Sequence, residues 1–385
     1  MKTNRQKLMV ISAIQALVLS GSGLIISLFG IIKFGATLWG EYIKIQLWLT
    51  PILLLTNWGS RNYLVQQFSI TPSKVGSIFL ENLVSRALLL PIAILVLFKV
   101  FDLNVVLFTI PILLLQYLYM SYDAVTVFSE RHKGRILAEV LGLCVFLIGG
   151  LLLDGFSLKY ILIIQLVGVI SKLTYLGWYL KGLSLFKSSV QMSIRKTLTA
   201  GFPFMIIGIS GLIQSKSDIY MLSYLSSSEN VASYQMLTGG LFVIQGTIAF
   251  LIDPLVKIVY RTKEVVFRKV RRVIMIIGAA IIFPGLFLLA VGLSYLLPEK
   301  FNMYSYTIAF LYLLPFIFYY PLILRLYKDN KHLLVAFISV IGGAVNAIAS
   351  FLLIPSYDLN GAILGTAFSQ FLILPLLVYF TRNSR

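Results

Sequence analysis

The chain has 385 residues, of which 59% are hydrophobic and only 12% are charged, and its formal net charge is +18. Soluble domains contain about 25% charged and about 45–50% apolar residues, so a water-soluble fold of this composition could not cover its own apolar surface. The basic residues lie between apolar segments rather than in one patch, which argues against nucleic-acid binding and indicates a membrane protein.

Twelve apolar segments are long enough to cross a bilayer as helices, which takes about 20 residues each. The first follows the basic start Met1–Lys7 and extends to about residue 32. This is longer than the apolar part of a signal peptide, about 7–15 residues, so we interpret it as a retained span. The predicted spans lie at about 8–32, 41–60, 79–99, 104–123, 136–153, 160–181, 201–225, 232–256, 274–297, 305–327, 332–354 and 360–381.

The lysines and arginines predict the orientation of these spans. With the N-terminus inside, 24 of them fall on the cytoplasmic side and only Lys33, Lys99, Lys159 and Lys300 fall outside. This bias follows the positive-inside rule and predicts that both termini are cytoplasmic. The outer loops are too short for a catalytic domain, so any function must lie within the helices or at their ends.

The two halves of the chain have the features of a repeat. Gly40–Tyr42 at the start of the second span matches Ala232–Tyr234 at the start of the eighth, at an offset of 192 residues. Six spans in each half give both halves the same orientation, and parallel repeats of this kind are typical of transporters. We expect an all-α fold of two six-helix lobes, 1–190 and 191–385, related by a parallel pseudo-two-fold repeat.

Ionisable residues within spans are the candidates for function, because a charge at the centre of a membrane helix costs about 2.5–3.5 kcal/mol on insertion scales and faces a cavity or a partner. A structural salt bridge is the alternative for Lys172. Snorkelling is the alternative for the residues nearer the surface. The candidate cations are Lys172, Arg86, Lys216, Arg61, Lys44 and Arg325, and the candidate carboxylates are Asp218 and Asp253.

Lys216 and Asp218 are two residues apart and should point to different faces of their helix rather than pair with each other. Four mid-span amides could line a path for sugars or equally make hydrogen bonds between helices. These amides are Gln116, Gln165, Gln245 and Asn346. The basic segment Lys257–Arg272 suits anionic lipid head groups, although the positive-inside rule already explains it.

Motifs for catalysis, metal binding and nucleotide hydrolysis are missing. His132 and His332 lie in predicted cytoplasmic loops without the spacing of metal ligands, and no glycine-rich phosphate loop is present. Cys144 cannot form an internal disulfide. We expect no enzymatic activity and no cofactor, with transport driven by an ion gradient, by the substrate gradient or by another protein.

Three short segments resemble a known family. They are Lys33–Tyr42 after the first span, the loop Phe128–Arg135, and the pair Ser217–Asp218 with the turn Val231–Tyr234 that follows it. On these segments the chain resembles, over its whole length, the O-antigen and polysaccharide-unit flippases (Wzx type) of the MATE-like superfamily. Members often carry a basic residue just after the aspartate, where this chain has Ile219.

The resemblance implies that the chain moves an undecaprenyl-diphosphate-linked oligosaccharide repeat unit across the bacterial inner membrane. The implied pathway partners are a polymerase and chain-length proteins. The candidate cations would hold the diphosphate, and Asp218 and Asp253 would couple transport to H⁺ or Na⁺. Two alternatives stay open: an ion-coupled drug antiporter, which favours an acidic cavity, and a membrane glycan polymerase or ligase, which usually carries a large outer loop.

Overall fold

The computed structural model describes residue 18 and residues 21–153, 157–181, 185–186, 193–261, 264–297, 300–329 and 331–382. Side chains of residues 249–270, 332 and 382 lie outside that description. The regular elements in the described residues are all helical. The opening part of the first predicted span lies outside the described residues, and its end is the apolar helix Gly21–Phe34.

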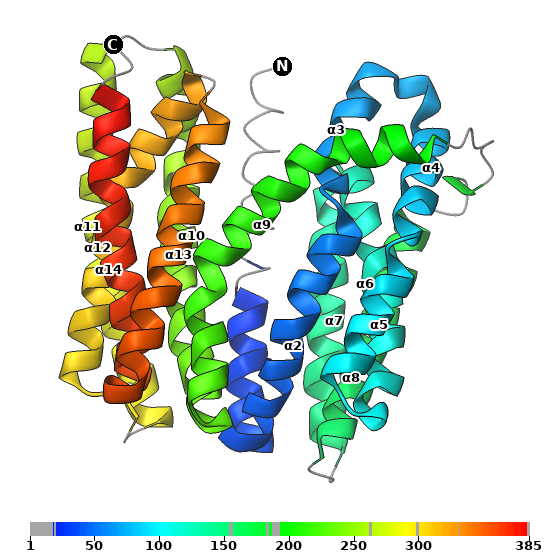
Figure 1. Ribbon diagram of the computed structural model, residues 1–385, viewed down its shortest axis with the longest axis horizontal. Helices are drawn as coiled ribbons and strands as arrows, with labels where there is room; N and C mark the ends of the chain where they lie inside the picture. Colours follow the sequence, from blue (N-terminus) through cyan, green and yellow to red (C-terminus); the bar gives the residue numbers. More distant parts are fainter. Residues whose placement is uncertain are drawn as a thin grey trace. The chain divides into compact units, whose positions relative to one another are not determined.

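The remaining helices follow one another along the chain (Figure 1). In chain order they are α2 (Ala36–Asn57), α3 (Ser60–Ile70), the 3-10 turn η1 (Pro72–Lys74), α4 (Val75–Ala87), α5 (Leu90–Val100), α6 (Leu103–Phe128), α7 (His132–Leu152), α8 (Leu158–Tyr179), α9 (Ile194–Leu225), α10 (Ser228–Arg261), α11 (Glu264–Leu296), α12 (Met303–Lys328), α13 (His332–Tyr357) and α14 (Leu359–Arg382).

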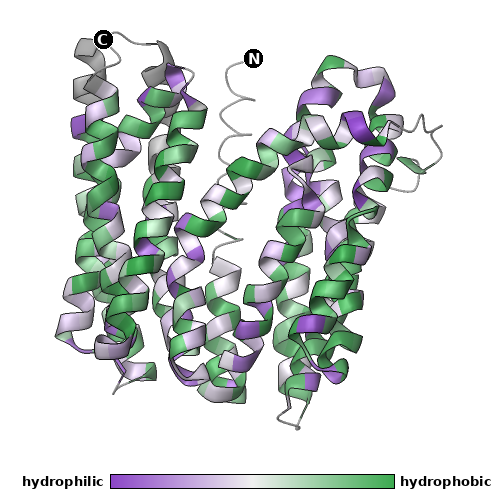
Figure 2. Ribbon diagram, in the orientation of Figure 1, coloured by the Kyte–Doolittle hydropathy of each residue, from purple (hydrophilic) through white to green (hydrophobic). Residues whose placement is uncertain are grey.

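The described part of each of the twelve predicted spans is helical or nearly so. Within the described residues, nine helical segments are long and apolar enough to cross a membrane, with η1, α4 and α5 counted together as Pro72–Val100. The other three predicted spans correspond to Gly21–Phe34, α2 and α10. Figure 2 shows apolar residues along most of the length of α5 to α8 and of α11 to α14. The predicted all-α, multi-pass membrane fold is confirmed, whereas α3 was not predicted.

Large apolar side chains cover the outer faces of these helices. On α11, for example, Phe283, Phe287 and Leu288 are 64%, 67% and 69% exposed. Soluble monomers rarely expose such contiguous apolar surface, because removing it from water is favourable by about 25 cal/mol per Å². A lipid environment removes this cost, so these faces contact the acyl chains of a bilayer.

The chain divides into two compact units. The first comprises residues 1–29 and 44–209, and the second comprises residues 30–43 and 210–385. The unit boundaries therefore fall inside α2 and α9 rather than in the loop near residue 190. Whether the symmetry-related lobes end at 190 and begin at 191 stays a prediction.

Each unit contains three consecutive helices that pack in the same way. In the first unit α8 packs against α6 and α7, and in the second α14 packs against α12 and α13. Helices α6 and α12 have 26 residues each and begin 200 residues apart, at Leu103 and Met303. We call α6–α8 and α12–α14 the repeated triplets, and their common packing supports a duplicated architecture.

The turns inside the repeated triplets also match. The residue before α7, Arg131, has φ −89° and ψ 43°, and the residue before α13, Lys331, has φ −92° and ψ 42°. The Arg131 amide donates to the Thr126 carbonyl at 3.0 Å, and the Lys331 amide donates to the Leu326 carbonyl at 2.9 Å. The backbone repeat is thus clearer than the sequence repeat.

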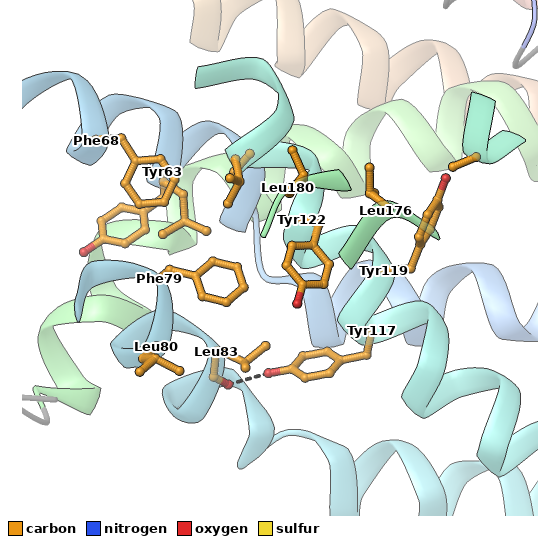
Figure 3. Packing of buried hydrophobic residues seen from close by; sticks show 14 residues of the cluster. Tyr63, Phe68, Phe79, Leu80, Leu83, Tyr117, Tyr119, Tyr122, Leu176 and Leu180 are labelled. Carbon is orange, nitrogen blue, oxygen red and sulfur yellow. Dashed lines mark hydrogen bonds between the residues drawn. The ribbon is translucent and has the colours of Figure 1, made fainter. Parts of the chain in front are cut away.

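The core of the first unit is an aromatic cluster between α3, α4, α6 and the end of α8 (Figure 3). Phe79 of α4 stacks near Tyr122 of α6, with ring centroids 5.7 Å apart. Tyr117 donates its buried hydroxyl to the Leu83 carbonyl, which satisfies a polar group that would otherwise be costly inside the bilayer. This cluster holds α6 beside α4 and so positions the polar side chains that these helices contribute to the candidate functional site.

Candidate functional site

Five ionisable side chains of the first unit form a continuous ion-pair network. Asp123 of α6 contacts Arg61 at 2.9 Å and Arg135 at 3.3 Å. Glu139 of α7 contacts Arg135 at 3.3 Å and Lys172 of α8 at 2.5 Å. With three cations and two carboxylates, this network, Arg61–Asp123–Arg135–Glu139–Lys172, carries one net positive charge.

The network extends from the helix ends into the span. Arg61 lies at the start of α3 with its side chain 54% exposed, and Arg135 lies in the first turn of α7 with its side chain 10% exposed. Lys172 lies within α8, about two turns before the helix ends at Tyr179, and its side chain is 23% exposed. The charges therefore alternate in sign along a path into the membrane region, and accessible cations stand at both ends of the path.

Lys172 projects from the inward face of α8. Gln165, Val169 and Leu176 on the same helical face are buried, whereas Ile170 and Trp178 on the opposite face are exposed. The accessible part of Lys172 therefore does not lie on the apolar outer face of α8. Two turns away on the same face, Gln165 exchanges two hydrogen bonds with Gln46 of α2, at 2.9 and 3.1 Å.

Gly142 of α7 makes room for the Lys172 side chain. A Cβ atom at Gly142 would lie 2.0 Å from Lys172 Cε, closer than real Cβ contacts allow. The absence of a side chain at this position lets the lysine cross α7 and reach Glu139. Tyr119 of α6 completes the arrangement: its hydroxyl donates to Glu139 at 2.7 Å, and the Arg135 guanidinium lies 4.4 Å from its ring centroid.

Arg86 is placed differently from Lys172 although both were predicted as substrate cations. It lies at the end of α4, just before the helix breaks ahead of Pro91, and only 1% of it is exposed. Its donors reach neutral acceptors: Asn82 at 2.7 Å, the Thr56 carbonyl at 3.2 Å and Ser121 at 2.8 Å. No carboxylate in the described residues pairs with it.

Asp218 of α9 forms the polar centre of the second unit. Its carboxylate accepts hydrogen bonds from the Tyr234 hydroxyl, from Thr366 at 3.0 Å and from the Ile219 amide at 2.8 Å. It is 5% exposed, and within the part of the chain that the structure describes no cation forms an ion pair with it. The carboxylate therefore retains capacity for a positive ligand.

A cavity of about 150 Å³ opens beside Asp218. Its lining combines hydroxyls and amides with a few apolar side chains. The polar members are Gln214, Ser215, Asp218, Tyr234, Thr238, Gln245, Tyr312, Tyr319, Thr366 and Gln370.

Oxygen atoms gather at one side of this cavity. Thr366 lies 3.2 Å from the Asn346 side-chain oxygen and 3.0 Å from the Ala362 carbonyl, as well as contacting Asp218. An all-oxygen set with one carboxylate fits a proton or a small hard monovalent cation and does not suit metals that need sulfur or imidazole. Within the described residues, no group of three or more histidine, cysteine and acidic side chains could hold a metal ion.

Lys216, Lys44 and Arg325 do not line the cavity beside Asp218. Lys216 does not pair with Asp218: its ammonium lies 5.5 Å from the ring centroid of Phe242. Lys44 of α2 and Arg325 in the last turn of α12 are half-buried. The side chain of Asp253 lies outside the described residues, and its role stays a prediction.

Sequence reasoning missed the acidic half of the ion-pair network. A salt bridge was the alternative for Lys172, but its partner was not named, and the structure identifies it as Glu139, 33 residues away. Glu139 lies four residues after Arg135, the spacing of an intrahelical ion pair, and this signal could have identified it. Asp123 is the last residue of the predicted span 104–123 and also met the criterion of an ionisable residue within a span, whereas Tyr119 gave no comparable signal.

The fold is that of the MATE-like transporters. It is similar to a structure titled lipid II flippase MurJ in its inward closed conformation, with a TM-score of 0.76 and 13% identity over 97% of this chain and 87% of that chain. It is also similar to a multidrug resistance MATE family transporter of the MOP superfamily, in inward-facing (TM-score 0.67, 12% identity, 96% and 94% covered) and outward-facing conformations (0.61, 11%, 98% and 95%). No model of a known protein family and no curated protein matches the sequence.

Proposed function

We propose that this chain is a flippase that moves an undecaprenyl-diphosphate-linked oligosaccharide, the repeat unit of an O-antigen or similar surface polysaccharide, from the cytoplasmic to the outer leaflet by alternating access. The observation that carries the proposal is the ion-pair network. An accessible lysine inside a span, as part of a network whose net charge is +1, suits a substrate whose head group is anionic. The likeness in fold to a lipid II flippase agrees with such a substrate.

The diphosphate would bind the cations at the two accessible ends of the network, Arg61 and Lys172. Arg and Lys form short, charge-assisted hydrogen bonds with phosphate oxygens. The prenyl tail can stay in the lipid while the head group crosses, so the protein needs a polar path only for the diphosphate and the sugars. Contributions from Lys44, Lys216, Arg86 and Arg325 remain part of the proposal on their charge alone.

Asp218 is the proposed coupling site for a proton or a sodium ion. The support is its burial, its neutral partners and the oxygen-lined cavity beside it. A cavity of about 150 Å³ admits an ion and water, whereas pockets for drug-sized ligands take about 300–1,000 Å³. This size favours ion coupling over direct binding of a drug in this cavity.

Reconstitution tests the proposal. Purified protein in vesicles should move a fluorescent prenyl-diphosphate oligosaccharide between leaflets, and Lys172→Ala should lower the rate at equal protein content. An inward sodium or proton gradient should accelerate wild type but not Asp218→Asn. A wild type that moves no prenyl-diphosphate substrate under any gradient would overturn the flippase assignment. Gradient-independent transport by wild type would remove the coupling role of Asp218.

In cells the flippase would act in the inner membrane ahead of the polymerase and chain-length proteins of the same pathway. Deleting the gene should trap lipid-linked repeat units in the cytoplasmic leaflet and abolish the surface glycan. Surface glycan reduced to single repeat units after deletion would instead identify a polymerase.

A further inference from the structure

One helix contact occurs in both repeated triplets but with different side chains, and in the first triplet it involves Lys172. Gly142 of α7 faces Lys172 of α8, and 200 residues later Gly342 of α13 faces Ile373 of α14. A Cβ at Gly142 would meet Lys172 Cε at 2.0 Å, and a Cβ at Gly342 would meet Ile373 Cδ1 at 2.2 Å. The same helix contact is therefore made once with a lysine and once with an isoleucine.

The ion pair is thus not needed for this way of packing two helices. Ser339 occupies the position in α13 that Glu139 occupies in α7, so the second triplet keeps the glycine contact without either charge. A charge within a span costs about 2.5–3.5 kcal/mol on insertion scales, which an isoleucine at this position avoids. The lysine and glutamate must therefore serve something other than helix packing.

Glu139 has polar partners that would remain if Lys172 moved away. Besides the lysine, it accepts a hydrogen bond from Tyr119 at 2.7 Å and lies 3.3 Å from Arg135. Its side chain is only 6% exposed, whereas that of Lys172 is 23% exposed. If the lysine turns away, the carboxylate still has a cation and a hydroxyl, so Lys172 can exchange partners without leaving an unpaired buried charge.

We propose that Glu139 is an internal counter-ion that occupies Lys172 until the anionic head group of the substrate displaces it, and that Gly142 lets the lysine reach this resting position. The inference rests on the proposed function, because it takes the lysine to be a ligand of the diphosphate. Competition by Glu139 keeps substrate binding weak enough for release on the far side. Glu139 and Gly142 act through Lys172 and are positioning residues.

Two variants should free Lys172 by different routes. Glu139→Gln removes the competing charge. Gly142→Ala keeps every charge but places a methyl group where the lysine stem lies, and this flexible stem can move aside. Gly168→Ala is the matched control, because its added methyl would face the same helix pair at an ordinary 3.6 Å from the Gly142 carbonyl. Lys172→Ile removes the cation and keeps the shape that the second triplet uses.

The measurement is binding of farnesyl diphosphate to the full-length protein in nanodiscs, together with flipping rates in vesicles. If Lys172 is free in roughly a tenth of wild-type molecules, freeing it tightens the apparent Kd by up to about tenfold. We expect Glu139→Gln and Gly142→Ala to bind more tightly and flip more slowly, Gly168→Ala to match wild type, and Lys172→Ile to bind weakly. In the double variant Glu139→Gln/Lys172→Ile the gain should vanish.

The outcomes separate this inference from the function on which it rests. Wild-type binding that Lys172→Ile abolishes, with no tightening in Gly142→Ala, would overturn the counter-ion role and leave the flippase standing. Tightening in Glu139→Gln alone would also overturn it, because removing any nearby negative charge favours an anion. Absence of binding by every form would overturn the proposed function and this inference together. Thermal unfolding of each variant shows whether it is folded. If Glu139→Gln does not fold, binding by Gly142→Ala still tests the counter-ion role.

Discussion

Arg86 and Lys172 are both cations of the first unit, but their surroundings differ and suit them to different roles. The guanidinium of Arg86 is buried and surrounded by neutral acceptors from α2, α4 and α6, and it lies 4.9 Å from the Tyr117 ring centroid. The ammonium of Lys172 has one strong partner and a partly accessible side chain. The first arrangement holds helices together, whereas the second can exchange its ligand.

Arg86 should therefore matter for stability. Arg86→Ala leaves Asn82 and Ser121 without their donor, and lost hydrogen bonds to a charged group cost about 1.5–3 kcal/mol each. We expect a lower unfolding temperature in detergent, only partly restored by Arg86→Lys because lysine lacks the planar fork of donors. Arg61→Ala, at a half-exposed side chain, is the control and should unfold near the wild-type temperature. An unchanged unfolding temperature in Arg86→Ala would contradict the structural role.

At the scale of the element, the helices were predictable because length and apolar composition decide whether a segment can cross a bilayer. The positions where helices break were not predictable from the sequence. Helix α2 ends where Trp58 and Gly59 both adopt positive φ, 46° and 65°, and the polar helix α3 follows. A Cβ at Gly59 would lie 2.5 Å from Phe204 of α9, so a contact remote in sequence fixes this turn.

The candidate site was predictable only in part, for a related reason. Cations inside spans can be read from the sequence, since each is costly and rare there. Their partners come from other helices, and the pairing depends on how those helices pack. Gln165 pairs with Gln46 across 119 residues, and Thr366 reaches Asp218 across 148. Neither pair has a spacing that could reveal it.

Gly40 of α2 offers a test of close helix packing within the second unit. A Cβ there would lie 1.7 Å from the Ser228 carbonyl oxygen at the start of α10, and backbone cannot move aside as a flexible side chain can. Gly40→Ala should destabilise the protein by about 1–3 kcal/mol, the usual cost of overpacking. Gly292→Ala in α11, where a Cβ meets nothing within 4 Å, should be neutral or slightly stabilising. The measurement is thermal unfolding of both variants. Equal unfolding temperatures would contradict the close contact between Gly40 and Ser228.

At the scale of the whole molecule, the two units share a repeated arrangement of helices but carry different polar groups. The ion-pair network occupies the triplet of the first unit. In the second unit Ile323, Val335 and Ile373 stand 200 or 201 residues after Asp123, Arg135 and Lys172. The buried carboxylate Asp218 belongs to the second unit. The repeated helix arrangement thus carries an ion-pair network in one unit and a buried carboxylate in the other.

The repeated turns make a prediction about topology. Because the turns before α7 and α13 share their geometry, they should lie on the same side of the membrane, and the positive-inside rule places both in the cytoplasm. In a Cys144→Ser background, Ser129→Cys and Asp329→Cys should be labelled only from the cytoplasmic side. Asp102→Cys and Ser227→Cys should be labelled only from outside. Labelling of the two turns from opposite sides would rule out a parallel repeat.

The surroundings of Arg86 also bear on the order in which the protein is made. As the chain is synthesised, Thr56 and Asn82 enter the membrane before or together with Arg86, whereas Ser121 follows a full span later. The arginine must be tolerated in the lipid during this interval, and the earlier acceptors are already present to receive its donors. We therefore expect α2 and α4 to associate while the ribosome is still translating α6, so that this buried charge orders the assembly of the first unit.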